Sequence, residues 1–255
     1  MRRFLIFATL FFLFAGNAEA LRVKQDMQTT IGFFDACEQS LTYGFYNDHD
    51  YDIKTTLKTT GTFGVLYPFD GMYHSVGTYE NEQFFPQNHF QELQSRFHHR
   101  TKEIVYENGV PIKRISVKDK YKKIAEIRTD AEKYGHTVDL LSTLAGLVEQ
   151  MLRTGKCDFE KYSFNGKKYS LLKIKDLGKE RIKTPYFSGR ARKCEYHLEI
   201  LKDAEAGFLL DKDVPIYLWV LNDKKSGAPF VAKAEVKKTP FGKLSSLTTK
   251  LEVTK

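Results

Sequence analysis

Short runs of alternating apolar and polar residues recur along the chain and constrain its fold more than any other feature. In residues 230–236, apolar side chains occupy every second position, and the same period of two recurs in residues 194–200 and 247–253. Successive side chains of a strand point to opposite faces of its sheet, so this period predicts half-exposed antiparallel strands. The pairs Asn108-Gly109 and Asn165-Gly166 are typical of tight turns between such strands.

Residues 138–153 follow a helical period instead. The apolar side chains there recur at intervals of three and four residues and form one stripe: Leu140, Leu141, Leu144, Leu147, Val148, Met151 and Leu152. Either Thr137 or Asp139 suits the start of this helix, and Gly155 suits its end. A curved antiparallel sheet wrapped around the helix buries the stripe, so we expect a mainly β fold with one amphipathic helix near residues 138–153.

Two further segments bear on the sheet. Residues 214–221 are continuously apolar, which predicts a strand covered on both faces at the centre of the sheet. Residues 90–97 fit helical and strand spacing equally well. The 20 Phe and 14 Tyr of the chain favour strands overall.

The first twenty residues have the features of a cleavable secretory signal peptide. Arg2 and Arg3 precede an apolar core at residues 4–15, and small residues stand at positions 18 and 20. The apolar core is shorter than the roughly twenty residues that span a bilayer. We therefore expect residues 1–20 to be removed and residues 21–255 to form a single β-rich domain in a bacterial periplasm, with no transmembrane segment in the mature chain.

The mature chain is moderately basic. Removal of residues 1–20 leaves 38 Lys and Arg against 31 Asp and Glu, a net charge of +7. Such a charge serves solubility or favours anionic partners such as lipid head groups or an acidic protein.

Three cysteines in an exported chain suggest one disulfide and one spare thiol. Cys157 follows the predicted helix, and Cys194 lies on an inward face of a predicted strand. We expect these two to be joined, which ties the end of the helix to the sheet. Cys37 is then a buried, inert thiol.

Basic residues cluster after the helix, with aromatic residues between them. The lysines that we assign to a basic rim are Lys167, Lys168, Lys173 and Lys175. In a cytoplasmic protein this composition would suggest nucleic acid, but export excludes that partner. The lysines then form a solvated face, or a dock for anionic lipid head groups or an acidic protein.

No constellation of residues predicts a metal or a catalytic set. His98 and His99 are adjacent and point to opposite faces of a strand, so one of the pair faces away from any metal shared with His89. Three alternating aspartates, Asp48, Asp50 and Asp52, fit a charged turn better than a calcium site. Ser75 and Ser142 lack the context of a nucleophile. We expect neither metal nor cofactor.

Several short motifs in order resemble a bacterial envelope family catalogued as domain of unknown function 3108. The motifs are Gly71 to Tyr79, Phe85-Pro86, Thr137 to Ser142, Cys157, Phe164 to Tyr169, Cys194, Pro215, Trp219, Asp223, Ala228-Pro229 and Thr239 to Leu244. The resemblance covers nearly all of the mature chain. It implies a half-open barrel or β-spiral like those of periplasmic lipoprotein carriers, and it implies no established activity.

Two functional hypotheses follow. The first is a non-enzymatic binding or chaperone-like protein that holds a lipophilic ligand or a partner segment in its concave sheet. Its leading contact residues are Tyr217, Trp219, Leu144, Leu147, Val148 and Met151. The second is an envelope hydrolase whose site assembles from distant residues among Ser75, His74, Asp139 and the Asp48 to Asp52 group. A purely structural role in envelope integrity is a further alternative.

Overall fold

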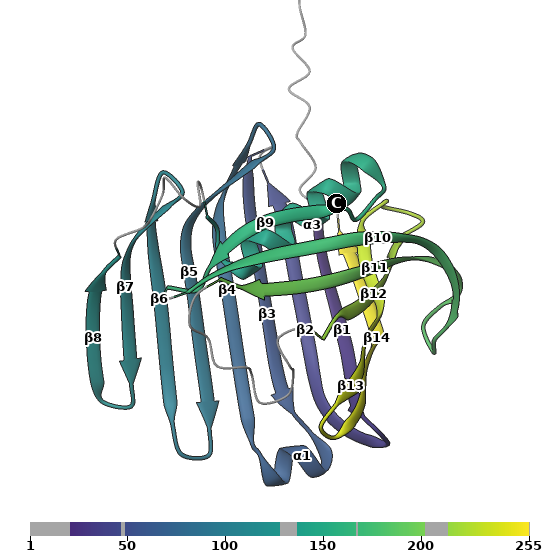
Figure 1. Cartoon of the computed structure of the whole chain (residues 1–255), viewed down its shortest axis with the longest axis horizontal. Coiled ribbons are helices and arrows are strands. Elements are labelled where there is room, and N and C mark those ends of the chain that lie inside the picture. Colours follow the sequence, from purple (N-terminus) through teal and green to yellow (C-terminus); the bar gives the residue numbers. More distant parts are fainter. Residues whose placement is uncertain (1–20, 47–48, 128–136, 167, 202–213, 255) are drawn as a thin grey trace, which may run out of the picture.

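The computed structural model of the chain describes residues 21–46, 49–127, 137–166, 168–201 and 214–254 (Figure 1). The strands are β1 (Leu21–Ile31), β2 (Phe34–Tyr46), β3 (Asp50–Thr59), β4 (Phe69–Glu80), β5 (Gln83–Ser95), β6 (His99–Glu107), β7 (Val110–Lys118), β8 (Tyr121–Glu126), β9 (Phe159–Phe164), β10 (Tyr169–Lys183), β11 (Ser188–Ile200), β12 (Ile216–Asn222), β13 (Pro229–Thr239) and β14 (Gly242–Thr254). The helices are α1 (Gly61–Leu66) and α3 (Leu140–Thr154). Residues 1–20, which carry the predicted signal peptide, lie outside the described residues.

The fourteen strands of the described residues form one antiparallel sheet in the order β8-β7-β6-β5-β4-β3-β2-β1-β14-β13-β12-β11-β10-β9. The first and last strands of the chain pair with each other within the sheet, and the two edges are β8 and β9, which are consecutive in sequence. The connection between these edge strands contains α3. The predicted single curved antiparallel sheet around one amphipathic helix is confirmed, and the sheet stays open between β8 and β9.

The C-terminal half of the sheet lies across the face of the N-terminal half that packs on α3, which we call the inner face (Figure 1). Arg114 Nη1 on β7 donates to Gly166 O in the turn after β9 at 2.7 Å. Tyr43 OH on β2 donates to Pro229 O at the start of β13 at 2.5 Å. The first bond joins opposite ends of the sheet order, and the second joins strands separated by β1 and β14, so the sheet curls over itself as a spiral.

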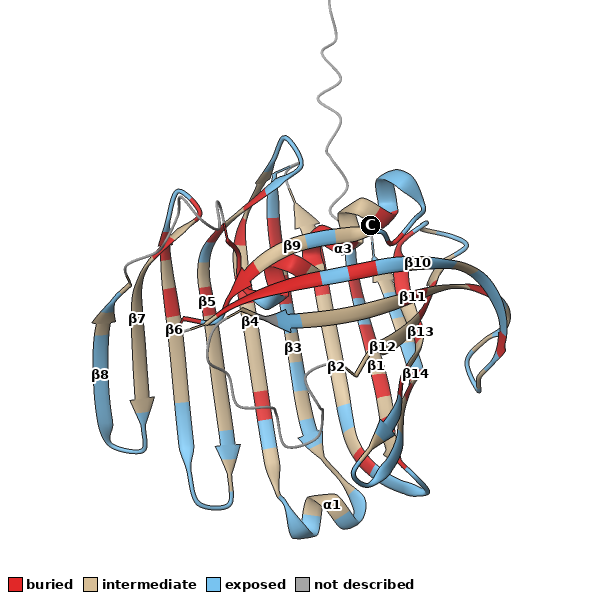
Figure 2. Cartoon of the chain, viewed as in Figure 1, coloured by how far each residue is buried: buried red, intermediate tan, exposed pale blue. Residues whose placement is uncertain are grey.

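Helix α3 fills the space between the two halves. Asp139 is its N-cap and accepts hydrogen bonds from the backbone N–H groups of Leu141 and Ser142, while Gly155 ends it with φ 66°. Leu141 and Ala145 pack against a cluster from β1–β3, whereas Leu147 and Met151 pack against β10–β12. Buried residues accordingly concentrate on α3 and β10, where the layers overlap (Figure 2).

A β-bulge interrupts the alternation predicted for residues 230–236. The pairing of β12 with β13 shifts by one residue, so that Phe230 lies opposite Leu221 and Ala234 lies opposite Leu218. Leu221 and Leu218 point to opposite faces of β12, and so do their partners. The expectation that Phe230 and Ala234 share one face is therefore wrong, because a bulge changes the face of every residue beyond it.

Two other expectations from the sequence are corrected or settled by the structure, and one helix was not expected. The apolar segment 214–221 forms β12, which lies between β11 and β13 rather than at the centre, where β1 and β2 stand. The two faces of β12 are covered differently: Val220 packs with Leu147 and Met151 of α3, and Trp219 packs with residues of neighbouring strands, including Phe230. Residues 90–95 belong to strand β5, and the sequence analysis did not predict α1. No helix in the described part of the chain has the length and apolar character to cross a membrane.

Candidate functional site

A buried polar cluster lies where the start of α3 meets strands β4 and β5. Ser75 on β4 and His89 on β5 are directly opposed in the strand register, and Asp139 faces both from the helix N-cap. The Ser75 hydroxyl donates to Asp139 Oδ1 at 2.6 Å and lies 2.8 Å from His89 Nδ1. His89 Nδ1 is 3.2 Å from the same carboxylate oxygen. These are three of the residue types of a hydrolase, brought together from distant positions.

The other oxygen of Asp139 is also engaged. Oδ2 accepts a hydrogen bond from the Ser142 hydroxyl at 2.6 Å, and that hydroxyl is 2.7 Å from Tyr51 OH on β3. Burial alone would raise the pKa of Asp139, but the facing His89 and the hydrogen bonds of the serine hydroxyls lower it to about 2. The carboxylate is thus held ionised inside the protein, paired with His89.

The hydrogen-bond directions of this cluster differ from those of a serine nucleophile. In a catalytic triad the serine donates to one histidine nitrogen, and the other nitrogen donates to the acid. Here Ser75 donates to Asp139, and the same nitrogen of His89 faces both. Ser75 is fully buried and Asp139 is 1% exposed, so a substrate does not reach them. The arrangement is suited to anchoring α3 on three strands.

The predicted contact residues on α3 are used in packing. Leu147 and Met151 are buried beside the disulfide, and Leu144 and Val148 pack against the cluster from β1–β3. Trp219 lies in a third cluster, with Ile182, Ala191, Phe230 and Ala232. The structure therefore separates Trp219 from the helix stripe, with which the binding hypothesis had grouped it.

Two lysines of the predicted basic rim, Lys173 and Lys175, point away from α3. Lys173 and Lys175 are exposed and alternate with Leu172 and Ile174, which are buried in the core. Lys173 Nζ pairs with Glu199 at 3.0 Å. Lys168 is half-buried, and Lys167 lies outside the described residues. Lys173 and Lys175 are therefore on the outer face of β10, and Lys173 is paired with a glutamate there.

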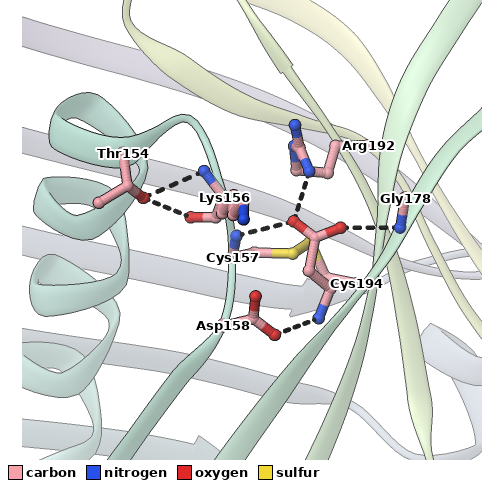
Figure 3. The surroundings of a disulfide bond; sticks show 8 residues. Thr154, Lys156, Cys157, Asp158, Gly178, Arg192 and Cys194 are labelled. Atoms are coloured by element: carbon pink, nitrogen blue, oxygen red, sulfur yellow. Dashed lines mark hydrogen bonds and ion pairs between the residues drawn. A yellow bond between two sulfur atoms is a disulfide. The ribbon is translucent and has the colours of Figure 1, made fainter.

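The disulfide between Cys157 and Cys194 is confirmed, with Cα atoms 6.2 Å apart and both cysteines fully buried. Figure 3 shows how it joins the segment after α3 to β11. Asp176 on β10 accepts hydrogen bonds there from Cys157 N at 3.3 Å, Gly178 N at 2.7 Å and Arg192 Nη1 at 2.5 Å. Burial would raise the pKa of Asp176, but these donors lower it. The sulfur atoms are buried, and the Asp176 carboxylate beside them already accepts three hydrogen bonds. Both features favour a structural disulfide over a redox site.

The histidines and aspartates considered for metal binding are dispersed. His89 is buried in the polar cluster, whereas His98 and His99 are exposed and pair with Asp119 and Glu92. Asp52 lies 3.2 Å from His74, and Asp48 lies outside the described residues. Within the described residues, no group of three or more His, Cys, Asp or Glu side chains is arranged to hold a metal ion.

The surface hollows of the described residues include one of about 550 Å³ beside Lys179, Arg181 and Arg190. Another, of about 700 Å³, is lined mostly by polar residues of β1–β5, including Glu38, Lys58, Asp70 and Glu92. Their positions alternate with those of the residues that face α3, so this groove is on the outer face. A crevice of about 90 Å³ lies beside α3 near Gly146.

The inner face changes character beyond the end of the region covered by α3. Leu57 and Leu93 lie on either side of Gly71 in the register, and Phe69 is next to them on β4. All three side chains are half-buried, and none belongs to the four buried apolar clusters of the described residues. A side chain at Gly71 would meet Phe69 at 3.0 Å and Leu93 at 3.4 Å, so these residues fill the space above the glycine. We call Leu57, Phe69 and Leu93 the inner apolar strip.

Sequence reasoning missed the meeting of Ser75 with His89 and the role of Tyr51. The signal that was available is the β4–β5 hairpin. A turn placed at Asn81 and Glu82 brings Ser75 opposite His89 once the bulge at Val76 is allowed for. The contact with Asp139 depends on where α3 docks, which no local pattern specifies.

Comparisons with known proteins agree with this fold. Among proteins with curated descriptions, none matches the sequence. Three solved chains match in structure, one of them the crystal structure of a beta-barrel-like protein of domain of unknown function DUF1849 from Brucella abortus. That match has a TM-score of 0.50 and 8% sequence identity, and covers 93% of this chain and 98% of the other. At this identity it supports the fold alone. The family model described as "Protein of unknown function (DUF3108)" matches residues 15–245, and the chain therefore belongs to that family.

Proposed function

We propose that the protein is an exported, non-enzymatic binding protein of the bacterial cell envelope, and that its inner apolar strip holds a lipophilic ligand. The observation that carries the proposal is the difference between the two parts of the inner face. Under α3 the face is filled by packed side chains, whereas Leu57, Phe69 and Leu93 remain half-buried without a partner cluster. Exposed apolar surface of this kind, bordered by polar groups, is typical of binding sites.

Polar side chains on the same face supply the border. Gln39 and Leu57 are directly opposed on β2 and β3, and Gln91 is opposed to Tyr73 on β5 and β4. Amide side chains donate and accept hydrogen bonds, so they suit the polar end of an amphipathic molecule. Export is supported by the signal-peptide features of residues 1–20 and by the disulfide, because disulfides persist in oxidising compartments.

The buried polar cluster argues for binding over hydrolysis. The Ser75 hydroxyl donates to Asp139, the N-cap of α3, and is buried from solvent. It is therefore engaged in anchoring the helix and is not placed to attack a substrate.

The test is binding of a fluorescent lipophilic probe, N-phenyl-1-naphthylamine, by the purified protein. The double variant Leu57→Gln/Leu93→Gln removes apolar surface from the strip at nearly constant side-chain size. Loss of this surface should weaken probe binding by about tenfold or more. Met72→Gln is the matched control, because Met72 is half-buried on the outer face of the same sheet.

Native mass spectrometry of protein purified from the envelope provides an independent readout. The expected result is a co-purifying lipophilic species that the double variant lacks. Absence of probe binding by the wild type, or an equal loss in Met72→Gln, contradicts the proposal. A co-purifying protein in place of a small molecule would identify the occupant as a partner segment.

A further inference from the structure

Five connections lie along one edge of the sheet, the lower edge in Figure 1. They are residues 32–33, 60–68, 96–98, 119–120 and 240–241. Contacts link neighbouring connections along the edge. Gly32 N donates to Lys243 O at 2.9 Å, and the rings of Phe63 and Phe241 are 6.1 Å apart. Arg96 Nη2 donates to Val65 O at 2.8 Å, and His98 Nδ1 lies 3.4 Å from Asp119 Oδ2. The five connections therefore form one continuous surface, which we call the aromatic edge.

Large apolar side chains are concentrated on this edge. Of the thirteen exposed large apolar residues in the described part of the chain, eight lie within three residues of the five connections. They are Phe33, Phe34, Val65, Leu66, Tyr67, Phe97, Tyr121 and Phe241. Phe33 is 103% exposed and Phe97 is 79% exposed. Neither side chain contributes to the core, so folding does not account for them.

The opposite edge of the sheet provides a comparison within the same molecule. Its described tight turns are Asn81-Glu82 and Asn108-Gly109, and Asn81, Glu82 and Asn108 adopt positive φ. These are polar turns of the ordinary kind. On the aromatic edge, Gly32 supplies the positive φ of a turn, and the position beside it carries an exposed phenylalanine where any polar residue would fit. The exposed apolar residues on this edge are thus not a requirement of hairpin geometry.

The charges of the aromatic edge are strongly biased. Within three residues of the five connections there are ten exposed cations and three exposed anions. The cations are Lys58, Arg96, Arg100, Lys118, Lys120, Lys122, Lys123, Lys237, Lys238 and Lys243, and the anions are Asp35, Asp70 and Asp119. Asp119 is already paired with His98. Exposed aromatic rings surrounded by basic side chains suit a surface with an anionic outer layer and an apolar layer beneath it. The cations match the outer layer, and the rings match the layer below.

We propose that the aromatic edge docks on the surface of an anionic phospholipid bilayer. Aromatic and aliphatic side chains at the tips of the connections enter the head-group layer, and the surrounding lysines and arginines meet the lipid phosphates. Several adjacent tips share one edge, so they enter together while the strand backbones stay paired outside the lipid. The aromatic edge adjoins the inner apolar strip, since Leu57, Phe69 and Leu93 lie within three residues of its connections, but the proposal does not rest on the function of the strip.

The proposal is tested by co-sedimentation of the purified protein with vesicles of phosphatidylglycerol and phosphatidylcholine, and with vesicles of phosphatidylcholine alone. We expect binding to the anionic vesicles, weaker binding to the neutral ones, and a decrease with salt. Phe33→Ser/Phe97→Ser should reduce binding to anionic vesicles by about tenfold or more, because it removes two exposed rings from the edge. Leu152→Ser/Leu177→Ser is the matched control, since these leucines are 41% and 43% exposed elsewhere.

The variant Phe33→Trp adds a direct readout of insertion. Its added fluorescence should shift to shorter wavelength with anionic vesicles, as the indole leaves water. Failure of the wild type to bind anionic vesicles, equal binding to both vesicle types, or equal losses in the two double variants overturns the proposal. Full binding by Phe33→Ser/Phe97→Ser overturns it as well, because cations alone would then account for attachment.

Discussion

Replacing Asp139 with alanine tests whether the buried polar cluster holds α3 in the sheet. The change removes the N-cap, which contributes about 1 kcal/mol in typical helices. It also leaves His89 and the hydroxyls of Ser75 and Ser142 buried without their acceptor. Each buried polar group left without its partner costs about 1–3 kcal/mol, and three such groups remain here. Because these contributions overlap, we expect the free energy of unfolding to fall by about 3–5 kcal/mol.

The measurement is urea unfolding under non-reducing conditions, followed by circular dichroism and by the fluorescence of Trp219. Asp223→Ala is the control, because Asp223 also accepts three hydrogen bonds, from Lys225 N, Ser226 N and Ser226 Oγ, but in a half-exposed turn. We expect a loss of about 1 kcal/mol or less for the control. A loss below about 1 kcal/mol for Asp139→Ala would refute the reasoning, since the cluster would then be an incidental contact.

The same cluster predicts a pH dependence. The pKa of Asp139 is lowered from 3.8 to about 2 in the folded protein. A carboxyl group whose pKa is lower in the folded than in the unfolded protein stabilises the fold at any pH above its unfolded pKa. This stabilisation is lost as the pH falls through its folded pKa. The contribution is about 2 kcal/mol, present above about pH 4 and lost towards pH 2. Asp139→Asn has no carboxyl group to titrate, so its stability should decrease less than that of the wild type over this range. Parallel acid profiles for the two proteins would contradict this assignment.

Three further changes have expected magnitudes. Cys157→Ser/Cys194→Ser should lower the free energy of unfolding by about 4 kcal/mol, from the entropy of the loop that the disulfide closes across 37 residues, and urea unfolding at matched reductant checks it. Gly155→Ala should cost about 1 kcal/mol through its positive φ alone, since nothing lies within 4 Å of an added Cβ; an unchanged urea midpoint would argue against the left-handed C-cap. Trp219→Ala should cost about 3–5 kcal/mol, because the indole is 3% exposed, and an unchanged melting temperature would remove Trp219 from the core.

Local patterns in the sequence were enough to predict the helix and its ends. The apolar stripe, Asp139 as one of two candidate caps, and Gly155 as the terminator all depend on residues within a few positions of one another. The Cys157–Cys194 bond was likewise predicted, because an exported chain favours one pair and these two cysteines flank elements that must pack together.

The bulges were not predicted, and they change which side chains share a face. A single inserted residue in β13 moves Phe230 to the face of Trp219. The alternation of apolar and polar residues in the sequence does not indicate where such a bulge occurs. The grouping of Trp219 with the helix stripe failed for a related reason. Trp219 and Val220 are adjacent on β12 and point to opposite faces, and it is Val220 that packs with Leu147 and Met151 of α3. A continuous run of apolar residues does not specify which of its two faces meets the helix.

The sequence by itself determined the class of fold, because side-chain period, turn residues and helix caps act between near neighbours in the chain. Only the tertiary structure decided that Ser75, His89 and Asp139 meet in a closed cluster, that Leu57, Phe69 and Leu93 stay half-buried, and that five connections bring their aromatic residues to one edge. These arrangements depend on strand register, bulges and the docking of α3, which are long-range packing choices with weak signals in any single segment.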